Sequence, residues 1–482
     1  MLSEYLARYW YEILAVAAYA AWAAWVTTVL LLARRPPMST MAWLLALLFL
    51  PYVGALIYFL FGPRRLRRKR LRYAKGRSAV SGQAAVMLAP PANLSEDFFL
   101  RYRQLATLAE RLEQPAPARA TLTRLYMDGD ALYDALIGTI GAARHHLHLE
   151  YYIWRPDRAG ARLRDALVER ARAGVQVRLL LDNVGSNATR DTFFAPIEAA
   201  GGEVAWFNRP RLKRLRLRHQ NFRTHRKILV ADGRVAFTGG MNVTDDHSRA
   251  AGGASAWRDT HLRFDGAPAA QLQRVFLDDW VFARGACEVL PEFFPDCPPG
   301  DGPFVQVISS GPDQDTWAIQ RVLFNAIANA RSSIRLTTPY FVPDESMLAA
   351  LVAAALRGVS VAILLPKQSD SRLVSAAARS YYEELAGVGI EIWEYGPPML
   401  HAKTSVFDGI VSLVGTANLD NRSFRLNFEV VAMVYSADTA KQLNSQFDAD
   451  LTLATRYMAP KRPLPVKERL LMGAARLFSP LL

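Results

Sequence analysis

The chain begins with two long apolar stretches and then changes to short runs of apolar and polar positions. Residues 13–33 and 41–61 form two stretches of 21 residues without a charge, separated by Arg34-Arg35-Pro36-Pro37. As a helix each stretch is about 30 Å long, which is enough to cross the hydrocarbon layer of a bilayer. A cleaved signal peptide has a shorter apolar region and a small-residue cleavage site. We therefore predict a transmembrane helical hairpin within residues 1–62.

Positive charge sets the predicted orientation of this hairpin. Nine Lys or Arg residues lie between positions 64 and 77, against two in the connection between the helices. Because Lys- and Arg-rich loops stay on the cytoplasmic side, we predict a polybasic cytoplasmic connector over residues 63–119. The same cations attract anionic lipid by about 1 kcal/mol each, a role that is compatible with the topological one.

From about residue 120 the pattern predicts a duplicated α/β fold. Short strand-like runs alternate with Ala-, Leu- and Arg-rich stretches of helical period. A predicted strand after position 143 has a counterpart after position 330, 187 residues later. A Gly-Val pair at position 174 has a counterpart at position 358, 184 residues later. Such repetition indicates two copies of one unit. The predicted parts are a first repeat at 120–287, a Pro-rich linker at 288–304, a second repeat at 305–455 and an amphipathic tail at 456–482.

Composition narrows the class of protein. Among 482 residues 51% are hydrophobic, which excludes a disordered or collagen-like chain. Lys and Arg number 58 and Asp and Glu 44, so the net charge of +14 favours an anionic partner: nucleic acid, a phosphorylated substrate or an anionic lipid. Cys287 and Cys297 are too few for a disulfide framework, and neither stands in a zinc-binding pattern.

One polar motif occurs twice with identical spacing. Each copy begins with His and continues with Lys at +2, Asp at +7, Gly at +14 and Asn at +17. A single copy would be a weak signal, but two copies in matching places of a duplicated chain argue strongly against two merely structural histidines. The motif residues are His225, Lys227, Asp232 and Asn242 in the first copy and His401, Lys403, Asp408 and Asn418 in the second.

Strand geometry predicts the surroundings of each histidine. Residues i and i+2 of a strand project from one face, so each Lys lies beside its His. The Asp-Gly pairs at 232 and 408 are hairpin turn signals. An ideal two-residue turn places Gly240 opposite His225 and Thr416 opposite His401, where small residues leave room for a phosphate. Both Asn side chains return to this face as hydrogen-bond donors, whereas both Asp side chains belong to the turns and lie outside the reaction centre.

A pocket formed by both copies would contain two His, two Lys and two Asn side chains. Cationic and amide donors of this kind suit a phosphodiester. One imidazole can attack phosphorus while the other protonates the leaving alcohol, and the symmetric pattern leaves open which does which. The motif offers neither a carboxylate cage for Mg²⁺ nor a three-histidine zinc set, so we predict a reaction without metal or cofactor.

These residues resemble the phospholipase D superfamily over about 120–455, and further segments are similar to bacterial cardiolipin synthases with two transmembrane helices. The further segments are residues 34–45, 310–313, 338–344, 418–424, 427–429 and 478–482. The resemblance implies duplicated repeats around one shared active site and a covalent phosphatidyl-histidine. It also implies a carboxylate that orients each His: Glu429 matches this position, with Asp259 as its counterpart. The chain departs from the pattern at Gly240, where many members carry Ser.

On this resemblance we expect a phosphatidyltransferase that converts two phosphatidylglycerol molecules into cardiolipin and glycerol. The usual family assignment makes His225 the nucleophile and His401 the acid. The expected location is the bacterial inner membrane, multi-pass, with a cytoplasmic catalytic part; the expected partners are phosphatidylglycerol, other anionic phospholipids and the bilayer, without nucleic acid. Two alternatives stay open: a hydrolase in which water resolves the intermediate, and a nuclease that uses the basic segment 209–227. The oligomeric state also stays open.

Three weaker signals complete the sequence picture. Residues 466–478 predict either an amphipathic helix at a lipid interface or an ordinary docking helix. Tyr151 and Tyr340, at corresponding strand ends, either border the pocket or belong to the core. The remaining histidines are interpreted as structural, with His148 as the best exception; they are His145, His146, His148, His219, His247 and His261.

Overall fold

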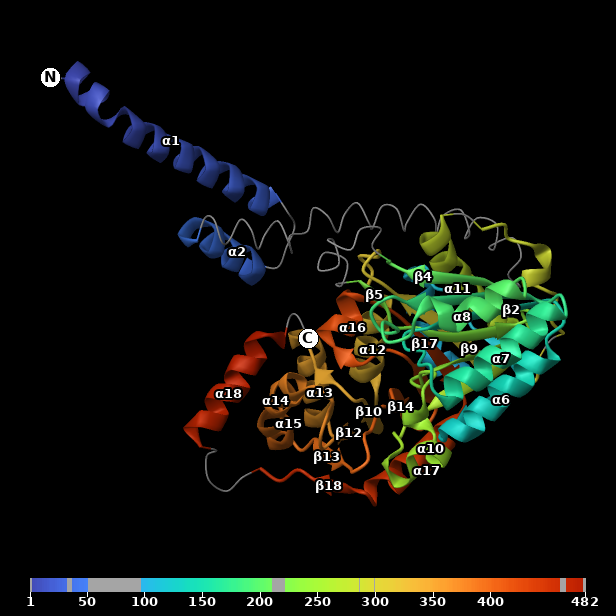
Figure 1. The fold of residues 1–482 in the computed structure, drawn as a ribbon. Helices are drawn as coiled ribbons and strands as arrows, with labels where there is room; N and C mark the ends of the chain where they lie inside the picture. The colour runs from blue at the N-terminus through green and yellow to red at the C-terminus, as the bar shows by residue number, and fades with distance from the viewer. Residues whose placement is uncertain are drawn as a thin grey trace. The chain divides into compact units, whose positions relative to one another are not determined.

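The computed structural model describes residues 2–32, 37–50, 97–209, 222–285, 287–298, 300–459 and 465–479. They belong to two compact units, Met1–Lys69 and Arg70–Leu482. Figure 1 draws the helices and strands of each unit as ribbons.

The first unit contains helices α1 (Leu2–Leu32) and α2 (Pro37–Phe49). Within α1, Tyr9–Leu32 is long and apolar enough to cross a membrane. The two helices touch, because the Tyr19 hydroxyl donates to the Leu48 carbonyl at 2.6 Å and Val26 packs with Leu47. The predicted hairpin is therefore shown in part: the second predicted span continues beyond Phe49 into residues 51–61, which lie outside the described residues. The polybasic stretch 64–77 also lies outside them.

A sixteen-stranded sheet runs through the second unit, and its strand order confirms the predicted duplication. From the outer edge to the centre, the first repeat contributes β4 (Glu203–Phe207), β3 (Gln176–Asp182), β2 (His146–Tyr151), β6 (Lys227–Ala231), β7 (Val235–Gly239), β8 (His261–Gly266) and β1 (Ala118–Tyr126). In the same order the second repeat contributes β13 (Glu391–Tyr395), β12 (Ser360–Pro366), β10 (Ser333–Thr337), β14 (Thr404–Phe407), β15 (Val411–Gly415), β17 (Asn427–Tyr435) and β9 (Phe304–Ser310).

Shorter strands complete this arrangement. β18 (Ala454–Arg456) pairs with β13 at the outer edge, β11 (Phe341–Val342) pairs with β16 (Leu419–Asp420), and β5 (Arg223–Thr224) pairs with β17. In the first repeat, the isolated bridge between Trp154 and Val243 matches the β11–β16 pair.

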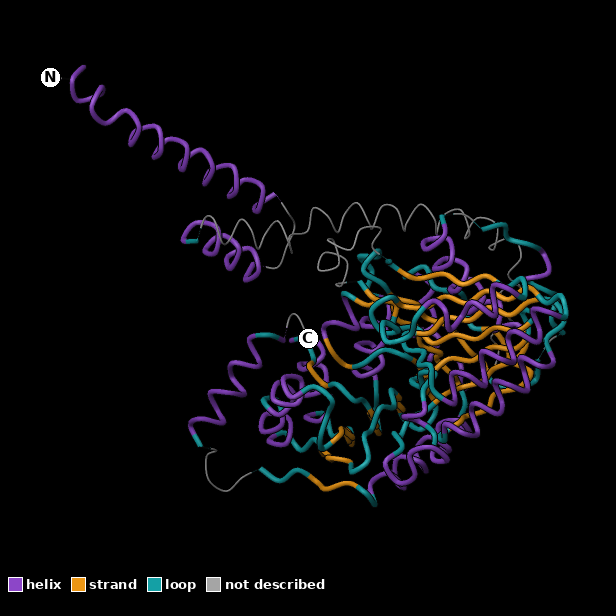
Figure 2. Tube along the Cα trace, viewed as in Figure 1, coloured by secondary structure: helices purple, strands orange, loops and turns teal. Residues whose placement is uncertain are grey.

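Helices cover both faces of the sheet, as the alternation within each strand requires (Figure 2). On β2, Leu147 and Leu149 belong to the core on one face, together with residues of α6 (Gly129–Ala142), α7 (Arg158–Arg172) and α8 (Asp191–Ala199). The intervening His148 faces α11 (Ala267–Arg284) on the other side and stacks on Phe276 at 4.6 Å. Asp157, one residue before α7, caps that helix by accepting from the Gly160 amide at 3.0 Å.

The second repeat follows the same plan. Its larger core lies between the sheet and the helices of one face, and α17 (Ala437–Leu451) covers the opposite face. The larger core includes residues of α12 (Ala318–Asn329), α13 (Glu345–Leu356), α14 (Arg372–Arg379) and α15 (Tyr382–Gly387). The remaining helices are α5 (Asp97–Arg111), α10 (Arg249–Gly252), α16 (Asn421–Arg425) and α18 (Val466–Leu477), with 3₁₀ turns at Asp245–His247, Gly253–Ser255 and Pro291–Phe293.

The repeats join edge to edge, through neighbouring strands of one sheet. β9 pairs with β17 of its own repeat over seven residue pairs and with β1 of the other repeat at residues 118–119. A free strand edge leaves backbone amides and carbonyls unpaired, so edge-to-edge joining satisfies groups that stacked sheets would leave open. The hairpins that follow the two motif histidines, β6–β7 and β14–β15, therefore lie in one continuous sheet.

Candidate active site

The backbone amide of each motif histidine donates a hydrogen bond to a carbonyl of the opposite repeat. The His225 amide donates to the Phe428 carbonyl at 2.9 Å, next to the parallel pairing of β5 with β17. In the matching place, Leu400 pairs with Arg258, and the His401 amide donates to the Arg258 carbonyl at 2.7 Å. Both histidines therefore lie at the boundary between the repeats.

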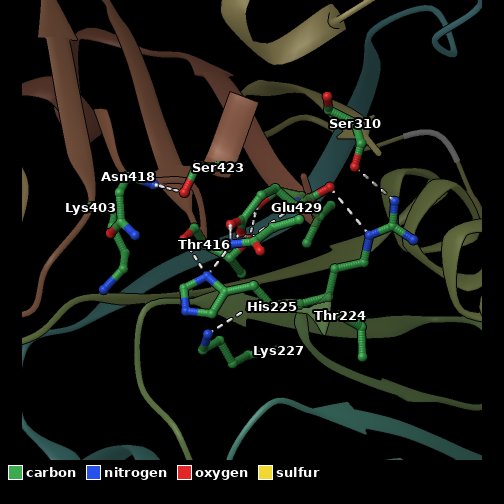
Figure 3. A network of polar contacts seen from close by, with 12 residues as sticks. Thr224, His225, Lys227, Ser310, Lys403, Thr416, Asn418, Ser423 and Glu429 are labelled. Carbon is green, nitrogen blue, oxygen red and sulfur yellow. Dashed lines mark hydrogen bonds and ion pairs between the residues drawn. The ribbon is translucent and has the colours of Figure 1, made fainter. Parts of the chain in front are cut away.

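A carboxylate from the opposite repeat holds each imidazole. His225 Nδ1 lies 3.0 Å from Glu429 Oε2, and His401 Nδ1 lies 2.6 Å from Asp259 Oδ2. Figure 3 shows Glu429 beside the His225 ring. When Nδ1–H donates to a carboxylate, Nε2 carries the lone pair and becomes the reactive nitrogen. The resemblance predicted a carboxylate for each His; the exchange between repeats follows from the cross-repeat strand pairing.

The two lysines lie beside their histidines and are buried. Lys227 Nζ donates to the His225 carbonyl at 2.6 Å, and Lys403 Nζ donates to the His401 carbonyl. Burial, helped by the nearby Lys403 charge, lowers the pKa of Lys227 to about 7. Burial lowers the pKa of Lys403 to about 8, against the opposing effect of Asp259 and Glu429. Two cations that repel each other in a buried site would both gain from a bound phosphate anion.

Burial favours the neutral form of both histidines. Burial lowers the pKa of His225 to about 4, although the Glu429 charge acts in the opposite direction. Burial also lowers the pKa of His401 well below its usual value, and the charges of Lys403 and Lys227 lower it further. Because Lys227 and Lys403 act on both histidines, the two copies of the motif share one electrostatic environment. A neutral imidazole is the form that can act as a nucleophile.

The two motif aspartates lie in turns away from the histidines. Asp232 accepts hydrogen bonds from the amides of residues 144, 145 and 146 at 2.8 to 2.9 Å. Asp408 accepts from the amides of residues 331, 332 and 333 at 2.7 to 3.2 Å. Each carboxylate thus connects its hairpin to the start of a neighbouring strand, β2 or β10.

The hairpin register differs from the ideal two-residue turn predicted from the sequence. Ala231 pairs with Val235 and Phe407 pairs with Val411, so each loop contains three residues. Asp232 adopts the left-handed conformation at φ 51° and is followed by a glycine that is also left-handed. The additional loop residue shifts every later position by one place in the ladder.

This shift changes the partners of Gly240 and Thr416. The Thr416 carbonyl lies 3.1 Å from His225 Nδ1, and its hydroxyl donates to Glu429 at 2.5 Å, so Thr416 supports the first histidine and not His401. A Cβ on Gly240 would lie 2.0 Å from Asp259 Oδ1. The small residue at 240 therefore makes room for a carboxylate and not, as predicted, for a phosphate.

The two asparagines occupy corresponding positions with different neighbours. The Asn242 amide donates to His247 Nε2 at 3.2 Å, and its side-chain oxygen accepts from the Ile153 amide at 3.2 Å. The Asn418 amide donates to Ser423 Oγ at 3.1 Å, as drawn in Figure 3. The side-chain oxygen of Asn418 is buried without a hydrogen-bond partner among the described residues.

Two aromatic residues near the histidines were missed in the sequence. The Tyr152 ring lies edge-on to the His225 ring at 4.9 Å, with Lys227 Nζ 5.4 Å from its centre. Trp257 lies 5.4 Å from the His401 ring. Of the two positions open to Tyr151, pocket border or core, its side chain takes the core, because β2 alternates and Tyr152 directly follows its end. Trp257 could have been expected near His401 from the sequence, because it lies two residues before Asp259.

Two further sequence interpretations concern Tyr340 and His148. The Tyr340 hydroxyl donates to Asp370 at 2.6 Å and is part-buried. His148 lies between Gln273 and Phe276 on the α11 face and belongs to the core. Among the remaining described histidines, His247 and not His148 lies beside a motif histidine, with its ring 5.8 Å from the His401 ring.

Among the described residues, His247, Asp259 and His401 offer atoms that could hold a metal ion, all within 4.8 Å of one another. Asp259 already accepts from His401 at 2.6 Å, and His247 Nδ1 lies 4.0 Å from Asp259. This trio contains the hydrogen-bonded pair of His401 and Asp259. Its chemistry is that of a carboxylate between two imidazoles.

Buried ion pairs fix the strands that carry the site. Arg226, between the first motif's His and Lys, pairs with Asp279 of α11 and donates to the Glu429 carbonyl at 3.2 Å. Arg258, next to Asp259, pairs with Asp450 of α17 at 3.0 Å. Each pair joins a residue adjacent to the site with a helix that covers the sheet, and loss of one partner would leave a buried charge unpaired.

Comparison with known proteins places the chain within a known family. Residues 136–280 and 323–451 match the family model described as "Cardiolipin synthase, PLD-like domain". Residues 20–63 match the model described as "Phospholipase_D-nuclease N-terminal". The two regions of the first match correspond to the two structural repeats.

Curated relatives match over nearly the whole chain. Cardiolipin synthase 1 of Bacillus cereus is 34% identical, with 95% of this chain and 92% of that protein covered. Cardiolipin synthase of a Geobacillus species is 38% identical, with 95% and 91% covered, and the major cardiolipin synthase of Bacillus subtilis is 36% identical, with 93% and 95% covered. Among solved structures, phosphatidylserine synthase of Haemophilus influenzae superposes with a TM-score of 0.60 at 13% identity, over 79% of this chain and all of that one. At this identity the superposition shows the fold alone.

Proposed function

The chain belongs to the cardiolipin synthase family of phospholipase D-like enzymes, and we propose that it joins two phosphatidylglycerol molecules through a phosphatidyl-histidine. The observation that carries this proposal is the pair of imidazoles, each oriented through Nδ1 by a carboxylate of the other repeat. Such a pair provides two reactive Nε2 atoms at one site. One can act as a nucleophile while the other transfers protons.

In the first half-reaction, His225 Nε2 forms a bond to phosphorus while the bond from phosphorus to the glycerol oxygen breaks. Glu429 stabilises the positive charge that develops on the attacking ring. His401, protonated once the phosphodiester anion is bound, gives its proton to the leaving glycerol, and Asp259 stabilises that protonated form. The assignment of nucleophile and acid follows the usual family pattern.

In the second half-reaction, the hydroxyl of another phosphatidylglycerol gives its proton to His401 and attacks phosphorus. The bond between phosphorus and His225 breaks, and cardiolipin is released. Lys227, Lys403 and the amide groups of Asn242 and Asn418 surround the phosphoryl oxygens and offset their growing negative charge. All proton and phosphoryl transfers in this scheme use side chains of the chain itself. Asp232 and Asp408 serve the reaction only by fixing the hairpins.

The chain acts at a membrane, and we propose the following topology and division of the chain. The hairpin of residues 1–62 crosses the bacterial inner membrane twice, and the polybasic connector 63–119 keeps the catalytic part cytoplasmic. The first repeat then spans 120–287, the linker 288–304, the second repeat 305–455 and the tail 456–482. Phosphatidylglycerol and other anionic phospholipids are the partners. Both substrates are amphiphiles, so an anchored enzyme meets them in the plane of the bilayer.

Product analysis tests the proposal directly. The detergent-solubilised full chain is incubated with pure phosphatidylglycerol, and the products are identified by mass. We expect cardiolipin and glycerol in equal amounts. Phosphatidic acid with glycerol and without cardiolipin would identify a hydrolase instead, because water would then resolve the intermediate. Cleavage of DNA without any change in lipid would support a nuclease.

A further inference from the structure

The C-terminal helix α18 is attached to the second unit along one narrow side. Ala475 is 2% exposed and belongs to the core of the second repeat, and the helix packs against α14. Met472 is half-buried, and Ser479, just beyond the helix, is buried. These positions are three and four residues apart, so they lie on one side of the helix.

The opposite side of α18 exposes large apolar side chains. At 100° per residue, Val466, Leu470 and Leu477 lie within one narrow sector opposite the attached side. Leu471 and Phe478 are also exposed, but they lie about 100° to 120° from the centre of that sector. Their exposed fractions are 69% for Val466, 68% for Leu470, 63% for Leu471, 82% for Leu477 and 50% for Phe478. An ordinary docking helix would bury its apolar side chains. This alternative from the sequence therefore explains the attached side of α18 but not the exposed apolar side.

Cations accompany the apolar side. Lys467 and Arg469 are exposed near the start of α18. Arg476 lies on the border between the attached and the apolar sides, 3.7 Å from Glu384 and over the Tyr381 ring at 4.5 Å. An apolar sector accompanied by cations is the pattern of a helix that lies in the interface of an anionic bilayer.

The far end of α18 is attached close to the active site. Asn421 Nδ2 donates to the Ser479 carbonyl at 3.1 Å, and the hydroxyls of Tyr381 and Ser479 lie 3.1 Å apart. Asn421 begins α16, three residues after Asn418 of the site. The helix is therefore connected to the segment that brings Asn418 to the histidines.

The exposed sector is too small for a stable contact with a second copy of the chain. A helix of 12 residues is about 18 Å long and about 10 Å wide. Two such sectors facing each other would bury a few hundred Å², whereas stable protein interfaces bury about 1,200 Å² or more. A bilayer has no such size requirement.

We propose that α18 inserts its apolar sector into the interface of an anionic lipid bilayer and thereby holds the α16 side of the active site against the membrane surface. This role goes beyond the proposed reaction. The apolar side chains enter the acyl boundary, and the cations lie at the headgroups. Lipid substrates then reach the site without leaving the bilayer.

A depth measurement tests the insertion without relying on catalysis. Full-length chains with Cys287→Ser and Cys297→Ser receive a single nitroxide label at Leu470→Cys or Leu477→Cys and are reconstituted in nanodiscs. Leu356→Cys is the matched control. Leu356 is 71% exposed and ends α13 before β12 begins, at the opposite end of the repeat from the site.

With anionic lipid we expect labels at 470 and 477 to contact dissolved oxygen more than a water-soluble nickel chelate, and the label at 356 to show the reverse. Equal nickel access at 477 and 356 would overturn the proposal, as would spin–spin broadening between two copies at 477.

An activity measurement tests the consequence and rests on the proposed function. We expect Leu470→Glu with Leu477→Glu to lower the rate on bilayer phosphatidylglycerol by about tenfold, equivalent to about 1.4 kcal/mol. The rate on monomeric short-chain phosphatidylglycerol should stay within about twofold, because α18 contributes no group to the chemistry. Leu356→Glu should affect neither substrate. Equal loss on both substrates would contradict the docking role, whereas absence of cardiolipin from the unmodified chain would contradict the proposed function and leave the depth result standing.

Discussion

At the residue scale, the two histidines depend on each other's repeat. His225 has Glu429 at Nδ1 and His401 has Asp259, and in both cases the carboxylate comes from the other half of the chain. Neither repeat alone contains a complete histidine–carboxylate pair. Both histidine–carboxylate pairs therefore require the duplicated chain.

The first prediction separates the two histidines. We expect His225→Ala to abolish cardiolipin formation and to prevent retention of ³²P from labelled phosphatidylglycerol, because the phosphorus–nitrogen bond has no acceptor atom. His401→Ala should lower turnover by about 10²- to 10⁴-fold, the range for general acid–base catalysis, while some label still accumulates. The measurement is single-turnover labelling followed by denaturing electrophoresis. Label on His225→Ala but not on His401→Ala would exchange the two roles, and more than about a tenth of activity in either variant would contradict the paired mechanism.

The second prediction concerns the lysines and pH. The pKa of Lys227 is lowered to about 7 and that of Lys403 to about 8, mainly by burial. Each lysine is charged below its pKa, so we expect kcat/KM to fall as pH rises through about 7 to 8. A bound phosphodiester favours the charged lysines, so kcat should fall at higher pH than kcat/KM. Initial rates across the pH range measure both, and identical profiles would contradict the assignment.

The same lysines give stability a pH dependence opposite to that of activity. Their pKa in the folded chain is below the ordinary value of 10.5, so the unfolded chain binds more protons over this interval. These two groups therefore contribute stability that increases as pH rises from about 7 towards 10.5. Activity and this part of the stability should change in opposite directions.

At the element scale, the β6–β7 and β14–β15 hairpins are held by their turns. Asp232 accepts hydrogen bonds from the backbone amides of residues 144–146. Asp408 accepts hydrogen bonds from the backbone amides of residues 331–333. Burial alone would raise the pKa of Asp232, but these amides together lower it below its ordinary value. Its stabilising contribution is present above the unfolded pKa of 3.8 and is lost as pH falls through the folded value.

The third prediction compares the stability and turnover of variants at the turn aspartates with those at the pocket lysines. Asp232→Asn and Asp408→Asn should each destabilise the fold by about 1 to 3 kcal/mol, because a neutral amide cannot accept from three amides equally well. Lys227→Ala and Lys403→Ala should lower the melting temperature less, because each removes a buried charge, while impairing turnover more. Thermal unfolding and initial rates of the four variants provide the comparison. Lys variants as unstable as the Asp variants would show that the lysines are structural.

At the scale of the whole molecule, the chain consists of a membrane unit and a catalytic unit. Both motifs and all strands of the large sheet lie beyond residue 117, whereas the membrane-length segment lies within Tyr9–Leu32. The chemistry and the anchor are thus separate in sequence and in structure.

The fourth prediction follows from this separation. Removal of residues 1–62 should leave activity on short-chain phosphatidylglycerol largely intact and weaken activity on bilayers much more, because anchoring raises the local concentration of lipid by orders of magnitude. The contribution of the basic stretch 64–77 to residual binding of anionic liposomes should fall steeply with salt, since the Debye length decreases from about 10 Å at 0.1 M to about 3 Å at 1 M. Binding through the apolar sector of α18 should depend little on salt. Flotation at both salt concentrations measures this. Salt-independent flotation would mean that the basic stretch 64–77 only sets topology, and equal loss on both substrates would mean that the hairpin is needed for folding.

The sequence by itself determined the class of chemistry and the duplication. The spacing of His, Lys, Asp, Gly and Asn is a local property, and its repetition identified two equivalent hairpins. Strand parity correctly placed Lys227 beside His225 and Asp232 in the turn. Apolar length alone predicted a membrane-crossing first helix. These conclusions need only interactions between residues close in the chain.

Only the tertiary structure decided which groups meet across the chain. Glu429 lies 204 positions from His225, and Asp259 lies 142 positions from His401; no local pattern encodes these partners, because they arise from strand pairing between repeats. The one-residue change in the hairpin loops likewise moved Thr416 to the other histidine, since left-handed Asp-Gly turns accommodate an extra residue that spacing does not reveal. The side of α18 that stays exposed was decided in the same way, by packing of Ala475 against a core assembled from distant segments.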